Sequence, residues 1–210
     1  MRWIIITPEY PPQPGGVSDY TRIFARALCS RGEDVSVWAP APQGRGPAYS
    51  CDDEESPISI HRLAGRYGPI SLMRLSQHLK KQSTPYRLLV QYVPHGYGWK
   101  AMNIFFALWL ALQRHAPMWI VFHEVAFPFR REQPWKLNLL AIVNRLMARL
   151  ALCGAERIFV TIPEWKALLA KLQWHKREMH LLPVFSNIPT CAEPEQTSYS
   201  RTVQWMRLDC

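Results

Sequence analysis

Residues 2–40 read RWIIITPEYPPQPGGVSDYTRIFARALCSRGEDVSVWAP, and this stretch decides the fold. Arg2–Thr7 is a short apolar run of the kind that a parallel sheet buries on both faces. A loop of prolines and two glycines follows, and Val17–Arg31 then places apolar side chains at helical spacing. Gly32 stands where a helix C-cap favours a left-handed residue, and Asp34–Trp38 is a valine-rich second strand. The order strand, helix, strand predicts a βαβ unit with two parallel strands.

The rest of the chain repeats this alternation of short strands and helices. Further strands are expected at Ile58–Leu63, Tyr86–Val93, Met118–Phe122, Arg157–Thr161 and Met179–Leu182, and helices at Ile70–Gln82, Lys100–Arg114, Pro134–Leu152 and Pro163–Leu172. This spacing predicts an α/β, Rossmann-like three-layer domain with a mainly parallel sheet over residues 1–189. Ala39–Pro57, rich in proline, glycine, serine and acidic residues, is expected to be a surface loop. Residues 190–210 are polar and without a sustained period, so we expect a disordered tail there.

The composition is that of a globular protein with a strong basic excess. Apolar residues make up 48% and charged residues 20% of the 210 positions, and the net charge is +9. Between Arg130 and Arg177, ten basic residues oppose three acidic ones, a net charge of +7. A basic surface attracts phosphates, anionic lipid headgroups or nucleic acid. The chain has neither a zinc-finger spacing nor a basic-aromatic RNA signature, so nucleic acid is not expected as a partner. An ordinary solvated helix surface is an equal alternative.

The cysteines and the apolar runs indicate where the protein resides. The five cysteines are scattered, with neither a C-x-x-C pair nor metal-ligand spacing, so we expect reduced thiols. The first apolar run ends at Pro8 and is too short for the core of a signal peptide. The longest apolar stretch, Ala101–Leu112, is far shorter than the roughly 20 residues that span a bilayer. We therefore expect a cytoplasmic protein that is soluble or peripheral at the inner membrane face.

Three loops that follow predicted strands carry residues suited to binding or proton transfer. In an open parallel sheet, ligands bind beyond the carboxyl ends of the strands. Gly15-Gly16 precedes a helix, whose free N–H groups favour an anion. The PHGYG loop at residues 94–98 offers an imidazole and a phenol. His123 follows a buried strand, with Glu124 beside it to orient or charge it. Each feature alone is more often structural, whereas three such loops at one edge favour a binding cleft.

Residues 7–40, TPEYPPQPGGVSDYTRIFARALCSRGEDVSVWAP, resemble the start of a retaining glycosyltransferase with the GT-B fold, of the family 4 type. In that family an apolar first strand leads into a loop with two glycines, an amphipathic helix and R-G-x-x-V before the second strand. His123-Glu124 is similar to the family's position for a histidine that faces the reacting sugar. PVFSNIPT at residues 183–190 resembles the stretch that closes the N-terminal domain, so the resemblance covers approximately Met1 to Thr190.

The resemblance implies an activity and a set of roles. The reaction moves a hexose from a nucleotide-diphosphate sugar to an acceptor hydroxyl, with retention and with neither a cofactor nor a required metal. Gly15 and Gly16 are implied to approach the phosphates of the donor. His123 is implied to contact the transferred sugar, with Glu124 beside it as a second catalytic candidate. The looser candidates on the acceptor side are Tyr10, Asp19, His95 and Tyr97.

The resemblance also implies a second domain that this chain does not contain. In the family, a C-terminal Rossmann domain binds the nucleotide and carries an E-x7-E pattern, and the chain ends where that domain is expected to begin. We therefore expect the N-terminal, acceptor-side half of a GT-B enzyme, without turnover alone. Two alternatives stay open. One is a noncatalytic binding or membrane-docking module that uses basic helices such as Pro134–Leu152, and the other is the remnant of a truncated gene.

Overall fold

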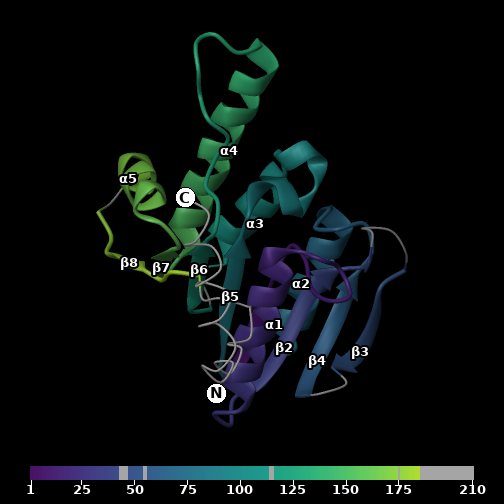
Figure 1. Cartoon of the computed structure of the whole chain (residues 1–210). Helices are drawn as coiled ribbons and strands as arrows, with labels where there is room; N and C mark the ends of the chain where they lie inside the picture. The colour runs from purple at the N-terminus through teal and green to yellow at the C-terminus, as the bar shows by residue number, and fades with distance from the viewer. Residues whose placement is uncertain (43–46, 54–55, 114–115, 175, 185–210) are drawn as a thin grey trace, which may run out of the picture.

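The computed structural model describes residues 1–42, 47–53, 56–113, 116–174 and 176–184. Figure 1 shows one sheet with helices on both of its faces. In chain order the elements are β1 (Arg2–Ile6), α1 (Gly16–Cys29), β2 (Asp34–Pro40), β3 (Tyr49–Asp53), β4 (Ser56–Leu63), α2 (Pro69–Lys80), β5 (Tyr86–Tyr92), the 3₁₀ turns η2 (Pro94–Tyr97) and η3 (Trp99–Ala101), α3 (Ile104–Leu112), β6 (Met118–Phe122), α4 (Trp135–Gly154), β7 (Arg157–Val160), α5 (Pro163–Leu172) and β8 (Met179–Leu181). The predicted α/β architecture is confirmed. The predicted tail, residues 190–210, lies outside the described residues, and the domain boundary at residue 189 stays a prediction.

The sheet has the strand order β3-β4-β2-β1-β5-β6-β7-β8. Every neighbouring pair is parallel except β3 and β4. The expectation of a loop over Ala39–Pro57 is therefore wrong in part, because Tyr49–Asp53 forms an antiparallel edge strand against β4. Its sequence, YSCDD, shows no apolar alternation, since four of its five side chains are exposed. Backbone hydrogen bonds to β4 hold this strand in the sheet. Its side-chain sequence gives no sign of this pairing.

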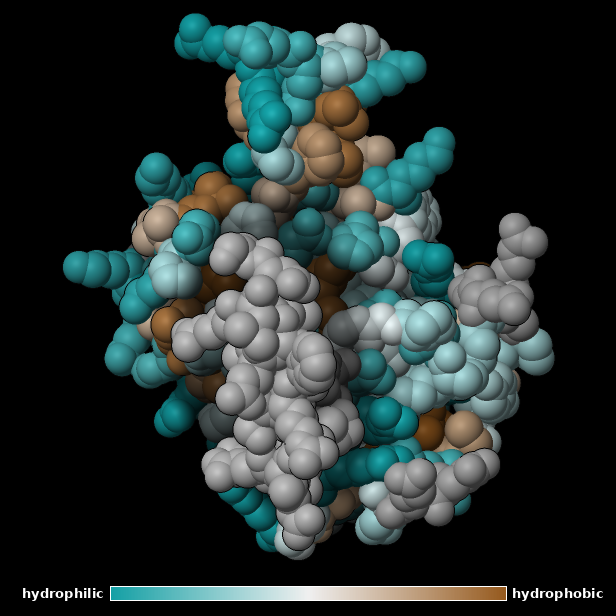
Figure 2. Space-filling view, viewed as in Figure 1, coloured by the Kyte–Doolittle hydropathy of each residue, from teal (hydrophilic) through white to brown (hydrophobic). Residues whose placement is uncertain are grey.

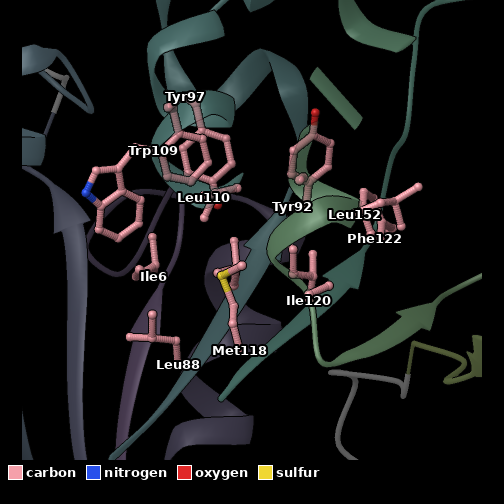
Figure 3. Packing of buried hydrophobic residues seen from close by; sticks show 14 of the residues in the cluster. Ile6, Leu88, Tyr92, Tyr97, Trp109, Leu110, Met118, Ile120, Phe122 and Leu152 are labelled. Atoms are coloured by element: carbon pink, nitrogen blue, oxygen red, sulfur yellow. The ribbon is translucent and has the colours of Figure 1, made fainter. Parts of the chain in front are cut away.

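Two hydrophobic cores lie on the two faces of the sheet. On one face, Ala25 of α1 packs on alternate side chains of the central strands, such as Ile5 and Val37. The larger core lies on the other face, beneath α2, α3, α4 and α5 (Figure 3). Its residues include Ile6, Leu88 and the other alternate positions of the same strands. Because both faces are covered, the central strands are largely apolar, as parallel strands are.

Helices α3 and α4 approach each other closely at a glycine. A Cβ atom added to Gly154 would lie 2.2 Å from the carbonyl oxygen of Leu110 and 2.7 Å from the terminal methyl of Met118. The last turn of α4 therefore lies directly against the backbone of α3. Only a residue without a side chain fits between these two helices.

Helix α3 begins four residues later than the sequence predicts. Trp99, Lys100 and Ala101 adopt left-handed φ angles of 55°, 52° and 66°, so they form a separate turn. Asn103 then caps α3, because its side-chain oxygen accepts a hydrogen bond from the backbone N–H of Phe106 at 3.0 Å. The left-handed conformation costs about 1–2 kcal/mol per residue, and it leaves the side chain of Trp99 on the surface.

Candidate functional site at the carboxyl edge of the sheet

Strand β1 lies where the strand order reverses. The chain moves from β1 to β2 on one side and later returns to add β5 on the other. The loops after β1 and β5 therefore lead to helices on opposite faces of the sheet, α1 on one face and α3 on the other. Ligands of open parallel sheets bind in the crevice at such a point. A cleft of about 490 Å³ is present there, lined by Pro8, Glu9, Gly15, Gly16, His95, Gly96, His123, Thr161 and neighbouring residues. The prediction that the three loops converge on one cleft is confirmed.

The floor of the cleft depends on a close contact between two loops. A Cβ atom added to Gly96 would lie 2.4 Å from the Cβ of Pro8. The β5 loop therefore approaches the β1 loop at a distance that only glycine permits. This contact explains why Gly96 is the first glycine of the PHGYG sequence. It also places the neighbouring His95 in the lining of the cleft.

The backbone N–H groups at the start of α1 are occupied by a carboxylate of the chain itself. Oε1 of Glu9 accepts hydrogen bonds from the N–H of Val17 at 3.2 Å and of Ser18 at 3.1 Å. The same carboxylate lies over Gly15, where a Cβ atom would come within 2.2 Å of Oε1. The glycines thus border a helix terminus whose free N–H groups bind the carboxylate of Glu9, and the predicted approach of a ligand anion stays a prediction.

His123 is held in one orientation at the end of β6. Its Nε2 lies 2.7 Å from Oε1 of the buried Gln91, and its ring meets the ring of Tyr20 edge-on, with centroids 4.9 Å apart. Its carbonyl accepts the indole N–H of Trp165 at 2.9 Å and the hydroxyl of Thr161 at 3.4 Å. With the Gln91 amide in this orientation its oxygen accepts, which assigns the proton to Nε2 and leaves Nδ1 as an acceptor.

Burial lowers the pKa of His123 from 6.5 to about 4. The charged imidazolium is disfavoured in the low-dielectric surroundings of Gln91 and Tyr20. At neutral pH the ring is therefore uncharged, with one fixed donor and one fixed acceptor. The uncharged ring can accept a hydrogen bond from a ligand hydroxyl through its unprotonated nitrogen.

Acid is expected to destabilise the fold through His123. The unfolded chain binds a proton near pH 6.5, whereas the folded chain resists protonation down to about pH 4, so stability falls as the pH falls between these values. At pH 5 the loss from this residue is about 2 kcal/mol relative to pH 8. Urea unfolding at both pH values measures it. His123→Gln is expected to lose about 2 kcal/mol less than the wild type over this range, and equal losses would contradict the assignment. His61, whose pKa is also lowered to about 4 by burial, contributes to both proteins.

Glu124 does not pair with His123, so the expectation that it orients that histidine is wrong. Its Oε2 lies 2.7 Å from Nδ1 of His95, and both side chains are exposed at the rim of the cleft. The backbone N–H of Glu124 and of His123 both point to the carbonyl of Tyr92. Successive side chains that leave a strand end diverge, and Glu124 is turned toward the β5 loop.

The three other acceptor-side candidates lie outside the lining of this cleft. Tyr97, predicted on an adjustable loop, is fully buried, and its hydroxyl donates to the carbonyl of Gln91 at 2.6 Å (Figure 3). Tyr10 is also buried and lines a second cavity, with its hydroxyl 3.4 Å from Oδ2 of Asp53. Asp19 lies on α1 beside Arg22, at 3.6 Å. An acceptor contact through the Tyr97 side chain is therefore incorrect, since its ring stacks on Phe106 in the core.

Glu9, Gln91 and Arg62 are important residues that the sequence does not single out. Gln91 is the one polar residue in the otherwise apolar centre of β5, and its position in a buried strand was the available signal. Its Nε2 is buried without a hydrogen-bond partner among the described residues. Arg62 is buried and donates to the carbonyls of Tyr10, Pro11 and Pro40, and no short motif reveals such contacts.

The described part of the chain contains no group of three or more His, Cys, Asp or Glu side chains that could hold a metal ion. The polar groups at the cleft are the imidazole of His123, which the Gln91 amide contacts, the backbone N–H groups at the start of α1 and the carboxylate of Glu9. The chain is thus a Rossmann-like domain with a cleft at its topological switch point.

Comparisons with known proteins identify the family. The Glycosyl transferase 4-like domain matches residues 15–184, and the chain belongs to this family. None of the curated proteins matches the sequence. Among solved structures the chain is similar to sucrose-phosphate synthase from Thermosynechococcus elongatus, with a TM-score of 0.64 and 16% identity. The match covers 89% of this chain and 49% of the synthase, so the chain spans about half the length of that protein. At this identity the likeness shows the fold alone, which is the N-terminal half of a GT-B arrangement.

Proposed function

We propose that the chain is the acceptor-side domain of a sugar transferase. The completed enzyme moves a hexose from a nucleotide-diphosphate sugar to an acceptor hydroxyl, with retention at the transferred carbon. The observation that carries the proposal is the neutral, orientated His123 in the same cleft as the anion-binding start of α1. An acceptor for sugar hydroxyls beside a site for phosphates suits a nucleotide-sugar donor.

Each group in the cleft has a role in this proposal. Nδ1 of His123 accepts a hydrogen bond from a hydroxyl of the transferred hexose. Gly15 and Gly16 let a donor phosphate approach the N–H groups of α1, once the carboxylate of Glu9 has moved aside. Burial keeps His123 uncharged, so the ring neither repels developing positive charge on the sugar nor needs a counter-ion. Glu124 and His95 border the entrance as a hydrogen-bonded pair.

Turnover is proposed to need a second domain. The described residues supply one wall of a cleft, and the related synthase is about twice as long as the matched region. A nucleotide held only at the edge of one Rossmann domain lacks contacts to its base and ribose. We therefore infer weak donor binding and no transfer by this chain alone, and detectable sugar transfer by the purified chain would contradict that inference.

Replacing Glu9 tests the proposed donor site. Because the Glu9 carboxylate competes with a phosphate for the N–H groups of Val17 and Ser18, Glu9→Gln is expected to bind nucleotide-diphosphate hexoses about fivefold more tightly than the wild type. This factor corresponds to about 1 kcal/mol, the typical strength of an anion at a helix N-terminus. Titrations of UDP-, GDP- and ADP-glucose followed by NMR measure the affinities. Signals of the His123 ring are expected to shift, while those of His61 stay in place.

The matched control is Asp34→Asn, which changes the charge equally at the opposite edge of the sheet. It is expected to leave nucleotide-sugar affinity unchanged. An equal gain in both variants would indicate general electrostatic attraction to a basic protein and would contradict a site at α1. If none of the three ligands binds to either Glu9 form, the proposed donor site is wrong.

A further inference from the structure

A basic and apolar arm projects from the domain at the edge that carries the cleft. We define the arm as residues 127–142, which comprise the loop before α4 and the first two turns of that helix. In Figure 1 this part of α4 extends beyond the rest of the domain. Helices that follow parallel strands begin at the carboxyl edge of the sheet, so the arm extends from the same edge on which the cleft opens.

The arm has a defined structure because two asparagines of α4 fasten the loop to the helix. Nδ2 of Asn138 donates to the carbonyl of Arg130 at 2.9 Å, and its Oδ1 accepts the N–H of the same residue at 3.2 Å. One turn and a half further on, Oδ1 of Asn144 accepts the N–H of Phe127 at 3.2 Å. These hydrogen bonds fix the backbone of the loop against α4.

Large apolar side chains cover the outer surface of the arm. Trp135 is 69% exposed, Ile142 54% and Phe129 51%. The exposed apolar side chains of the arm are Phe129, Trp135, Leu137, Leu139 and Ile142. Trp135, Leu139 and Ile142 follow one another at helical spacing, so they form a stripe along one side of α4. In Figure 2 hydrophobic and hydrophilic surfaces lie side by side on this projection.

Basic side chains flank this stripe. Arg130, Arg131 and Lys136 are exposed, whereas Glu132 is the one acidic residue between positions 127 and 142. The ammonium group of Lys136 lies 6.0 Å from the ring centroid of Trp135. A tryptophan beside lysine and arginine suits the boundary between headgroups and acyl chains, where the ring enters the apolar layer and the cations meet lipid phosphates.

Helix α4 is long and apolar enough to cross a membrane by length and composition, with a mean hydropathy of 1.4 in its most apolar window. Its second half is nevertheless part of the domain core. Met147, Ala148, Ala151 and Leu152 are buried against the sheet and α3. Because these residues are packed inside the domain, α4 does not present an apolar surface all round, and the part of it that projects from the domain is the arm.

A second group of exposed apolar residues lies at the start of α3. Trp99 is held on the surface by the left-handed turn at residues 99–101, and its ring contacts Phe105 edge-on at 5.1 Å. Ile104, Phe105 and Leu108 are exposed, and Lys100 lies beside them. Asn144 connects the two regions, since its Nδ2 donates to the carbonyl of Ala101 at 2.6 Å while its Oδ1 holds Phe127. The backbone strain at residues 99–101 thus keeps an aromatic pair on the surface next to the arm.

We propose that the arm docks on an anionic lipid bilayer, with Phe129 and Trp135 inserted and Arg130, Arg131 and Lys136 at the headgroups. The proposal goes beyond the sugar-transfer function and does not rest on it. The net positive charge of the arm, set around a projecting apolar stripe, selects an anionic lipid surface over a neutral one. A cytoplasmic protein docked in this way would place its cleft at the inner membrane face.

Vesicle co-sedimentation of the full chain tests the proposal. Vesicles of phosphatidylcholine with 30% phosphatidylglycerol are expected to bind the wild type at least tenfold more tightly than vesicles of phosphatidylcholine alone. The preference is expected to fall in high salt, because screening weakens attraction to the headgroups. Phe129→Ser with Trp135→Ser is expected to weaken binding at least tenfold. Arg130→Gln with Arg131→Gln is expected to remove most of the preference for the anionic vesicles.

Matched controls lie on other exposed surfaces. Ile70→Ser removes an exposed apolar side chain from α2, and Lys166→Gln with Lys171→Gln removes two exposed charges from α5. Both controls are expected to bind like the wild type. Equal losses in the arm variants and the controls, or no binding to anionic vesicles, would overturn the proposal. Ultracentrifugation without lipid provides a second readout, since a dimer that the arm variants abolish would assign the surface to a second copy of the chain instead.

Discussion

Arg62→Met is expected to lower the free energy of unfolding by about 4 kcal/mol. Arg62 is 3% exposed, and its guanidinium donates to the carbonyls of Tyr10 at 3.3 Å and Pro40 at 3.2 Å, and also to that of Pro11. Methionine fills a similar volume but donates no hydrogen bond, so buried carbonyls would lose their partner. Each such group costs about 1–3 kcal/mol, and the apolar side chain recovers part of the loss.

The effect is expected to reach the cleft as well. Arg62 fastens the loop after β1 to the end of β2, and Glu9, which caps α1, lies in that loop. Urea unfolding at pH 7.5 measures the stability, with Arg22→Met as the control, because Arg22 is only partly buried on the surface of α1. The control is expected to change stability by less than about 1 kcal/mol. Similar stabilities for the two variants would show that Arg62 does not hold the loop.

Gly154→Ala is expected to destabilise the domain by about 3 kcal/mol. The new methyl group would lie 2.2 Å from the carbonyl oxygen of Leu110, which is backbone and cannot rotate away. Helices α3 and α4 would have to separate, and their shared core would lose contact. Overpacking of a well-packed interior typically costs about 1–3 kcal/mol, and a clash with backbone lies at the upper end.

The control for this change is Gly16→Ala, where a Cβ atom would meet nothing within 4 Å. It is expected to be neutral or to stabilise the domain by less than about 1 kcal/mol, because alanine reduces the freedom of the unfolded chain. Thermal unfolding of both variants measures the difference. A Gly154→Ala protein as stable as the wild type would mean that α3 and α4 separate there without cost.

The fold was predictable because its strands are buried on both faces. Apolar runs such as Trp3–Ile6 and Met118–Phe122 are hard to explain except as central strands of a covered sheet. The edge strand Tyr49–Asp53 was missed because most of its side chains are exposed, so no alternation of apolar and polar residues marks it as a strand. The start of α3 was misplaced because its delay depends on a left-handed turn that no glycine marks at residues 99–101.

The cleft was predictable in outline but not in its contacts. Loops at the carboxyl ends of parallel strands lie at the same edge of the sheet, and this predicted that Gly15 after β1 and His123 after β6 share one edge. Which side chains pair within the cleft depends on angles and distances between segments far apart in the chain. Gln91 holds His123 across 32 positions. Tyr97 is buried because a core cluster beneath its loop accepts the ring, and a glycine-rich loop gives no sign of such a cluster.

The strand order has a consequence for how the chain folds during synthesis. β1 emerges first, β2 pairs with one of its edges, and the β3–β4 hairpin then extends that side. β5 takes the other edge of β1, and β6, β7 and β8 follow outward in turn. Every new strand therefore joins a free edge, and none has to insert between two strands that are already paired. Such an order suits folding from the N-terminus while the chain is still being made. The free edge of β1 stays available until β5 has been synthesised.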